Sequence, residues 1–557
     1  MRVRKIGVVV QCGLAVALSM PLALAYADSI GNANPAAIVL AEELDPSVYS
    51  AVIQQVPAGV ELRYPTLVAK IYQQRQFQPL WNDHQVRVSL EQQINIIALA
   101  DVSAWFEERA RLLMQTKQEQ NWLSYEVLAT DLLLAYLRYQ QDVVHEGKAW
   151  LFGAGVPIST FEPEPAAIAR LLHAVNENYL FSWLDGNKPA GRAYDNMLAA
   201  ILALQALEEA PLPTFQQAGL IRPGEALDDA QALVAILIAL GDMPEYLGEA
   251  LLQEVPSVYA NEMVEAVERF QSRHGLKVDG IIGPNTKAWL NTPLEERVRL
   301  MALNMERLRI WSSQRDSMLV VNIPDYELTL WQENQVEFSS KVIVGRPSRR
   351  TPLLTSRLDT VVFNPPWNVP TSIMRKDILP KVKANHNYLD ENNYQILVSW
   401  RSSDVIPADM INWENISVHH FPYRLRQSPG DHNALGRYKF NMPNNNAIYL
   451  HDTPAKNLFT QSQRAFSSGC IRVEGAADLA DWLMDRSGVS ASRVEKYEQR
   501  KTTKFVPVTK HIPVETIYQT AWFDEEEGTR QYRTDIYHYD QSQHWPFDDE
   551  LLTALGL

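Results

Sequence analysis

The first half of the chain repeats apolar residues at helical spacing. Residues 66–76, 125–144 and 167–184 each place apolar side chains three and four positions apart, which is typical of amphipathic helices. We therefore predict a helical scaffold domain over residues 28–227. Its tryptophans could line a sugar-binding groove, but large aromatic side chains more often pack in a core. The residues concerned are Trp81, Trp105, Trp122, Trp150 and Trp183.

A short helical unit and a charged helix follow. In "MVEAVERFQSRHGLKVDGIIGPNTKAWLN", residues 263–291, an apolar helical face is followed by a glycine-containing turn and a second short helix. The pattern alone predicts a small helix-turn-helix unit. The charged stretch "PLEERVRLMALNMERLRIW" then predicts a linker helix within residues 294–314.

Beyond residue 315 the pattern alternates between apolar and polar positions. Residues 317–345 have this alternation around a turn, and residues 358–370 and 446–454 continue in the same style, as strands do. We predict a mainly β domain over residues 315–500, which makes the whole chain a multidomain α+β protein.

Two segments of the C-terminal half depart from this strand pattern. Residues 375–425 are polar and rich in turns, and a connection of that length usually serves as a lid or binding loop, so we predict an inserted cap over a site. The alternative is a peripheral subdomain without substrate contact. Residues 501–557 contain two strand-like stretches around "DEEEGT", which predict a C-terminal β hairpin packed against the preceding domain.

The N-terminus has the features of an export signal. "MRVRK" is positively charged, an apolar run follows, and Ala25 and Ala27 fit a small-x-small cleavage site, so residues 1–27 are predicted to be a signal peptide. The alternative is an uncleaved inner-membrane anchor, because the run approaches the roughly 20 residues that a membrane helix needs. Either way, the remaining chain is expected in the periplasm.

The charge balance and the cysteine count narrow the function. The net charge is −15, and removal of the three cations in residues 1–27 makes it −18, which argues against nucleic acid as a partner. Of the two cysteines, Cys12 lies in the predicted signal peptide, so Cys470 would remain alone in the exported chain. A lone thiol in an oxidising compartment is either a buried spare or a reactive group.

A histidine near this cysteine favours a reactive thiol. His451 stands at the end of a predicted strand, and Cys470 lies in the turn "SSGC" ahead of an apolar pattern typical of a helix. A helix N-terminus would favour the thiolate, and an imidazole is suited to act as its base. The backbone N–H groups of Gly469 and Cys470 could hold a developing oxyanion, which together gives acyl transfer as the reaction class.

Residues 449–473, "YLHDTPAKNLFTQSQRAFSSGCIRV", resemble the active-site segment of the L,D-transpeptidase family. The stretches 342–352 and 361–373 resemble the same family, and a cap inserted after the Pro-Trp segment is similar to its large-cap subgroup. Residues 266–286 resemble the small three-helix peptidoglycan-binding domain, which can also serve as a rigid module only. This resemblance implies a domain over residues 228–293 whose first helix is "LVAILIALGD", residues 233–242.

The resemblance implies roles for individual residues. Cys470 would be the acylated nucleophile and His451 the general base, oriented by a backbone carbonyl at Asp452. Many members have a second histidine directly before Gly-Cys, where this chain has Ser468, so the base role depends on His451. Arg472 would contact a substrate carboxylate, unless it pairs with Glu474 at the surface. The residues expected to contact substrate or oxyanion are Tyr449, Asp452, Ser468, Gly469, Arg472 and Trp367.

The family resemblance also implies a reaction. It would be the formation of 3→3 cross-links between peptidoglycan stem peptides through a cysteine thioester on a tetrapeptide stem, with release of D-alanine and no cofactor or metal. A cell-wall cysteine carboxypeptidase or endopeptidase is the rival enzyme, although His451 precedes Cys470, the reverse of the order in papain-like peptidases. The chain could also be a wall-binding protein that attaches another acceptor, or a wall-binding protein without activity. Further candidate partners are other cell-wall synthesis enzymes.

Overall fold

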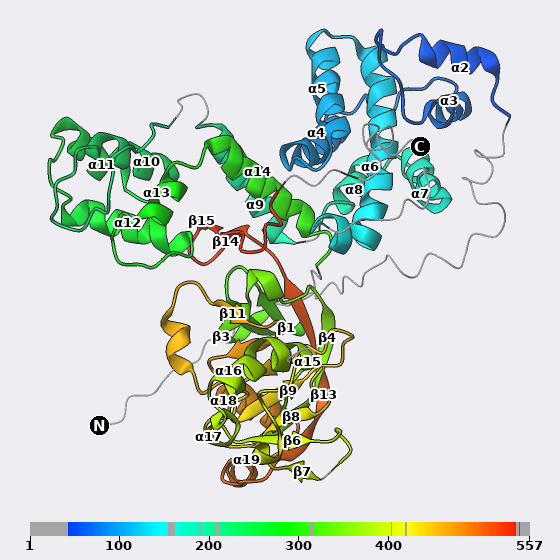
Figure 1. Ribbon diagram of the computed structural model, residues 1–557. Coiled ribbons are helices and arrows are strands. Elements are labelled where there is room, and N and C mark those ends of the chain that lie inside the picture. The colour runs from blue at the N-terminus through cyan, green and yellow to red at the C-terminus, as the bar shows by residue number, and fades with distance from the viewer. Residues whose placement is uncertain are drawn as a thin grey trace, which may run out of the picture.

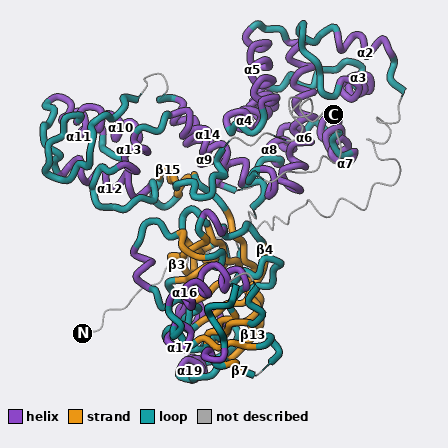
Figure 2. The backbone as a smooth tube through the Cα atoms, in the orientation of Figure 1, coloured by secondary structure: helices purple, strands orange, loops and turns teal. Residues whose placement is uncertain are grey.

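The computed structural model has three lobes (Figure 1). A helical scaffold and a smaller helical unit lie on one side of a β-rich lobe, as the distribution of helices and strands in Figure 2 shows. The predicted signal peptide lies outside the described residues. No helix of sufficient length and apolar character to cross a membrane occurs in the described part of the chain. The structure describes residues 43–153, 162–189, 191–207, 212–311, 316–402, 404–417, 420–541 and 545.

The scaffold is built around the long helix α6, Trp122–Trp150, whose middle turns are buried on all sides. As expected, Trp81, Trp105 and Trp150 pack in the core, whereas Trp122 is 47% exposed. The remaining helices are α2 (Pro46–Ile53), α3 (Pro65–Gln74), α4 (His84–Leu99), α5 (Ala104–Gln118), α7 (Pro165–Asn176), α8 (Leu180–Gly186) and α9 (Arg192–Gln205).

Helix α14, Leu294–Arg307, corresponds to the predicted linker helix and packs against α4 and α9. Two of its charged residues, Glu306 and Arg307, are buried and paired. Glu306 accepts from the Tyr139 hydroxyl at 2.9 Å and pairs with Arg309 at 2.7 Å. Arg307 pairs with Asp540 at 2.7 Å. Since an unpaired buried charge is costly, these contacts hold the linker, the scaffold and the C-terminal segment together.

The smaller helical unit contains α10 (Ala230–Leu240), α12 (Asn261–Arg273) and α13 (Pro284–Leu290), with the short helix α11 (Glu245–Gln253) between the first two. Helix α12 ends at Arg273 with His274 as its C-cap, and Gly275 continues the chain at φ +61°, a left-handed conformation that glycine adopts easily. Buried Arg273 pairs with Asp242 after α10, which ties the helices together.

The β-rich lobe is a closed sheet with the strand order β11-β3-β12-β10-β9-β4-β13-β1-β2. Because β2 also pairs with β3, the sheet closes into a barrel. Helix α18 (Ala476–Arg486) contacts β9 and β13, and α19 (Ala491–Glu498) packs on α18. The strands are β1 (Ser317–Asn322), β2 (Glu327–Gln332), β3 (Gln335–Gly345), β4 (Thr355–Phe363), β9 (Tyr438–Asn441), β10 (Leu450–His451), β11 (Ala465–Ser467), β12 (Ile471–Val473) and β13 (Lys504–Ile517).

The segment after residue 500 contains one strand more than the hairpin predicted around "DEEEGT". Strand β13 lies inside the barrel sheet, parallel to β1 and antiparallel to β4. The hairpin itself comes later, with β14 (Ala521–Asp524) and β15 (Thr529–Tyr532). It packs on α9, α12 and α14, and Trp545 reaches the scaffold, where it donates to Asp142 at 3.0 Å. The C-terminal segment therefore connects all three lobes, because its buried aromatic residues have partners in each.

The predicted cap is a subdomain with its own core. Strands β5 (Trp367–Asn368), β8 (Arg424–Gln427), β6 (Tyr394–Leu397) and β7 (Val405–Ile406) form a second sheet in that order. Helices α15 (Thr371–Ile373), α16 (Leu379–Ala384) and α17 (Tyr388–Glu391) complete it, with a π-helical turn over Met374–Ile378. Although the segment is polar in sequence, its buried cluster includes Met374, Leu389, Trp413 and Leu425.

Candidate active site

Two parallel neighbouring strands bring the predicted nucleophile and base into one region. Strands β10 and β12 pair with Leu450 opposite Ile471 and His451 opposite Arg472. Cys470 directly precedes β12, and the N–H of Ile471 donates to the Tyr449 carbonyl at 3.1 Å. Because this ladder fixes the register, Cys470 comes opposite Tyr449, two positions before His451 on the neighbouring strand.

Hydrogen bonds within the "SSGC" turn hold Cys470 in position. The Ser467 hydroxyl donates to the Cys470 carbonyl at 2.6 Å and accepts from the Gly469 N–H at 3.1 Å. Gly469 has φ +114°, a conformation that side chains resist, and an added Cβ would lie 3.2 Å from Ile448 Cδ1. The Thr351 hydroxyl donates to the Gly469 carbonyl at 2.8 Å. Ser467 was not among the predicted site residues, although its place in the motif was a usable signal.

The Cys470 thiol is held in its neutral form. Burial raises its pKa above the ordinary value, and Tyr449, Lys439 and Arg472 offset part of that rise. Helix α18 begins only at Ala476, with β12 in between. The prediction that a helix N-terminus favours the thiolate is therefore wrong, since the dipole acts over about one turn and burial dominates here.

His451 is a buried, neutral imidazole. Its Nδ1 lies 2.5 Å from the carbonyl oxygen of Asp452, and because a carbonyl only accepts, Nδ1 carries the proton and Nε2 is free to act as a base. Burial and the Arg472 charge lower the pKa of His451 to about 3. The Asp452 carboxylate is used elsewhere, since it accepts from the Arg437 N–H at 2.8 Å and pairs with Lys456 at 2.7 Å.

Tyr449 and Trp367 lie against the thiol. The Tyr449 hydroxyl interacts with Cys470 and with Trp367, which comes from β5 of the cap. Burial and the neighbouring Cys470 raise the pKa of Tyr449, so its hydroxyl remains protonated. The thiol itself lies 4.0 Å from the carbonyl of Ala447. A neutral hydroxyl donor therefore lies beside the sulfur.

Two cations lie near the thiol. Lys439, on β9 directly opposite His451, has its Nζ 4.1 Å from the centre of the Tyr449 ring, and burial lowers its pKa. The sequence pattern contained no signal for Lys439, because only the strand register brings it here. Burial and nearby Arg346 lower the pKa of Arg472. Its Nε is buried without a hydrogen-bond partner, and the ion pairs of the described residues do not include an Arg472–Glu474 pair.

Ser468 links the turn to the cap through Arg349. Arg349 Nη1 donates to the Ser468 hydroxyl at 2.9 Å, and the same guanidinium forms a bidentate pair with Asp377 of the π-helical turn, 3.1 Å at Nη2. The cap therefore touches the site twice, through Trp367 and Asp377. This contact argues against a purely peripheral subdomain. The described residues contain no grouping of three or more His, Cys, Asp or Glu side chains arranged to hold a metal ion.

Comparison with known proteins gives matches along most of the chain. Residues 316–508 match the family described as the L,D-transpeptidase catalytic domain. Residues 66–201 match a scaffold domain, and residues 228–290 a "Putative peptidoglycan binding domain". A Haemophilus influenzae protein named "Putative L,D-transpeptidase" is 31% identical over 481 residues, which cover 86% of this chain and 79% of that protein.

Solved structures of L,D-transpeptidases also match, at lower identity. The enzyme from Stackebrandtia nassauensis is 13% identical with a TM-score of 0.20, and the match covers 55% of this chain and 96% of that one. The enzyme from Mycobacterium smegmatis is 13% identical with a TM-score of 0.18, covering 36% and 58%.

The predicted family and its peptidoglycan-binding domain are thus confirmed by the sequence matches. On the identity to the Haemophilus influenzae protein across most of both chains, this protein belongs to the L,D-transpeptidase family.

Proposed function

We propose that this protein forms 3→3 cross-links in peptidoglycan. Cys470 attacks the carbonyl carbon between the third residue of a tetrapeptide stem and its terminal D-alanine, and D-alanine leaves. The observation that supports this most is the neutral His451, whose Nδ1 proton is held by the Asp452 carbonyl at 2.5 Å, on the strand next to Cys470. A neutral thiol beside a neutral imidazole can attack a carbonyl carbon while the imidazole takes the thiol proton.

In the first half-reaction His451 Nε2 takes the thiol proton while Sγ bonds to the carbonyl carbon. The Tyr449 hydroxyl and the Cys470 N–H are the donors available to the resulting oxyanion, since the Gly469 N–H already bonds to Ser467. The imidazolium then gives its proton to the departing D-alanine nitrogen as the C–N bond breaks. The product is a thioester on Cys470 and a neutral His451.

In the second half-reaction an amine attacks the acyl-enzyme. The side-chain amine of the third residue of another stem attacks the thioester carbon, and His451 takes a proton from that amine. His451 passes this proton to the sulfur as the C–S bond breaks, which restores the Cys470 thiol and the neutral imidazole. A new amide joins the two stems. Attack by water in the same step would make the protein a carboxypeptidase or endopeptidase, and another nucleophile would give attachment of a different acceptor.

Arg472 is proposed to bind a substrate carboxylate. Its guanidinium lacks a carboxylate partner among the described residues and has a buried Nε without an acceptor. A buried cation in this state gains more from a ligand anion than a solvated one does. A stem peptide carries such carboxylates beside the scissile bond.

The reaction requires export to the wall. Residues 1–27 have the composition of a signal peptide, and residues 228–290 match a peptidoglycan-binding domain. We therefore propose a periplasmic location with peptidoglycan as both donor and acceptor.

Mass spectrometry of the protein with a defined disaccharide-tetrapeptide tests the proposal. The expected adduct on Cys470 is the stem without its D-alanine, followed by a cross-linked dimer. Cys470→Ala should abolish the adduct completely because no other nucleophile replaces the sulfur. Cross-linking retained by this variant would refute the mechanism, and a tripeptide product without dimer would favour the hydrolytic reaction.

A further inference from the structure

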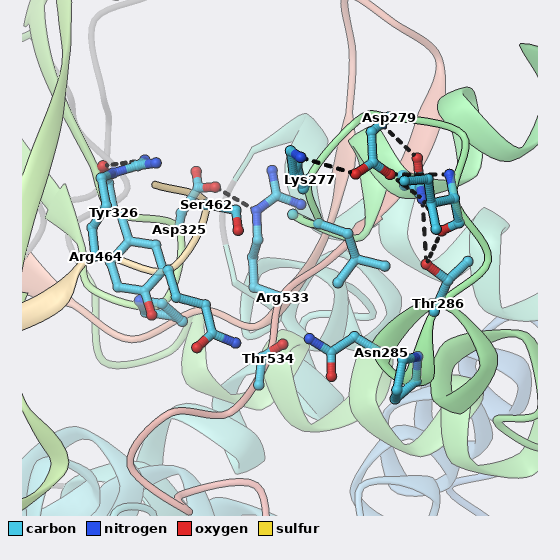
Figure 3. Close-up of a pocket in the computed structure, with 18 of the residues that line it drawn as sticks. Lys277, Asp279, Asn285, Thr286, Asp325, Tyr326, Ser462, Arg464, Arg533 and Thr534 are labelled. Carbon is cyan, nitrogen blue, oxygen red and sulfur yellow. Dashed lines mark hydrogen bonds and ion pairs between the residues drawn. The ribbon is translucent and has the colours of Figure 1, made fainter. Parts of the chain in front are cut away.

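A cavity of about 540 Å³ lies between the peptidoglycan-binding unit, the barrel and the C-terminal segment (Figure 3). Its volume is within the range of about 300–1,000 Å³ that small-ligand sites have. Neither Cys470 nor His451 lines it, so it is a different site from the one already described.

Several separate parts of the chain supply the walls of this cavity. The turn between α12 and α13 contributes Lys277, and the first turn of α13 contributes Asn285. The turn between β1 and β2 contributes Asp325 and Tyr326. The C-terminal segment contributes Arg533 after β15. A ligand in the cavity would therefore contact the peptidoglycan-binding unit and the catalytic barrel at the same time.

One wall belongs to the chain that leads into the nucleophile turn. Ser462, Gln463 and Arg464 line the cavity, and β11 follows directly, ending at Ser467. Arg464 donates to the carbonyls of Tyr326 at 3.1 Å and Val342 at 3.2 Å, which holds this wall to the barrel. The cavity is thus connected to Cys470 by a short, well-anchored stretch.

The lining carries both signs of charge. Lys277 pairs with Asp279 at 3.1 Å and Arg533 with Asp325 at 2.5 Å. Lys341 is exposed and has no ion pair among those of the described residues, and Glu327 lies opposite it in the β2–β3 ladder. A ligand with both carboxylate and ammonium groups can pair its carboxylate with a lining cation and its ammonium with a lining carboxylate, so that no charge is left unpaired.

We propose that this cavity binds a non-reacting stem peptide of peptidoglycan, which rests on the proposed function. A stem carries carboxylates and an amine, as the mixed lining requires, and its amides suit Asn285 and Gln463. A bare glycan fits less well, because sugars usually stack on exposed rings and Tyr326, the aromatic residue among the described lining, is 6% exposed. Binding a neighbouring stem would hold the strand while another stem reaches Cys470.

Calorimetric titration of the full chain carrying Cys470→Ala tests this, because that variant cannot turn over its ligand. The probes are the disaccharide-tetrapeptide and a peptide-free glycan of equal length. The additional substitutions Lys277→Glu and Lys341→Glu should together weaken binding of the first probe about tenfold. The pair Arg493→Glu and Lys496→Glu, both exposed on α19 away from the cavity, is the matched charge control and should leave binding unchanged.

Asn285→Trp provides a second variant that fills the cavity without changing charge, and it should weaken binding by a similar factor. Unchanged binding in both variants would overturn the proposal, and so would equal binding of the peptide-free glycan. The proposed function is tested separately by the Cys470 adduct of the otherwise unmodified chain. The cavity substitutions can also be made in the chain that keeps Cys470. If such variants form the adduct with a free tetrapeptide at the rate of the unmodified protein, and the same substitutions leave binding of the disaccharide-tetrapeptide unchanged, the proposed function stands and only this inference fails.

Discussion

The barrel and the cap differ in how they are attached to the rest of the molecule. Buried barrel residues belong to the same hydrophobic cluster as those of the scaffold and the peptidoglycan-binding unit. The cap has a separate cluster, which includes Leu379, Ile396 and Phe421. Its polar links to the site are Trp367 to Tyr449 and Asp377 to Arg349.

On the proposed mechanism, the barrel carries the reacting groups and the cap controls access of the substrate to them. Cys470, His451 and Lys439 are on or next to adjacent barrel strands, where displacement would break a shared core. A subdomain with its own core and few polar links can shift as a unit at lower cost. Substitutions in the barrel should therefore change the rate of the chemical step, whereas substitutions at the links to the cap should change substrate binding.

The largest effect is expected from His451→Gln, which keeps a polar side chain but removes the base. The rate of thioester formation should fall about 10²- to 10⁴-fold, measured by mass spectrometry against time. Because the pKa of His451 is lowered to about 3, the base remains neutral as the pH falls from 7 to 5 and is lost only near pH 3. An unmodified protein whose rate halves near pH 6.5 would contradict this.

A smaller effect is expected from Lys439→Met. The Lys439 charge lowers the pKa of Cys470, so its removal should raise that pKa further and move thiol alkylation by iodoacetamide to higher pH. A shift of one pH unit would slow alkylation at pH 8 about tenfold. Lys439→Arg keeps the charge and serves as the control. An unchanged profile would mean that Lys439 does not act on the sulfur.

The smallest effect is expected from Arg349→Gln, which cuts the link between cap and turn. A partly exposed ion pair contributes little, so we expect about a two- to fivefold rise in KM with kcat nearly unchanged. Asp377→Asn should act similarly, and the double variant should add little because both remove the same contact. Asp409→Asn, in an exposed part of the cap, is the control.

A fall in kcat with an unchanged KM for Arg349→Gln would contradict the division of roles between barrel and cap. It would mean that Arg349 positions the nucleophile turn through Ser468, so that the cap takes part in the chemistry.

Several features could be predicted from the sequence because they depend on short stretches of chain. Helical periodicity indicated the scaffold, and alternation indicated the barrel strands, since both patterns record which face of an element is buried. The segment 449–473 contains both Cys470 and His451, so one local motif was enough to predict the family. Even the Asp452 carbonyl is a neighbour of His451 in sequence.

Other features required the tertiary structure. Lys439 faces His451 through strand register, and Arg349 meets Asp377 across the junction of barrel and cap, contacts that no local pattern contains. Strand β13 enters the barrel from beyond the predicted domain boundary because its partners β1 and β4 lie far back in the sequence. The protonation states also depend on the tertiary structure. The motif defines which titratable groups are present, but burial by segments distant in sequence keeps Cys470 a thiol and His451 an uncharged imidazole.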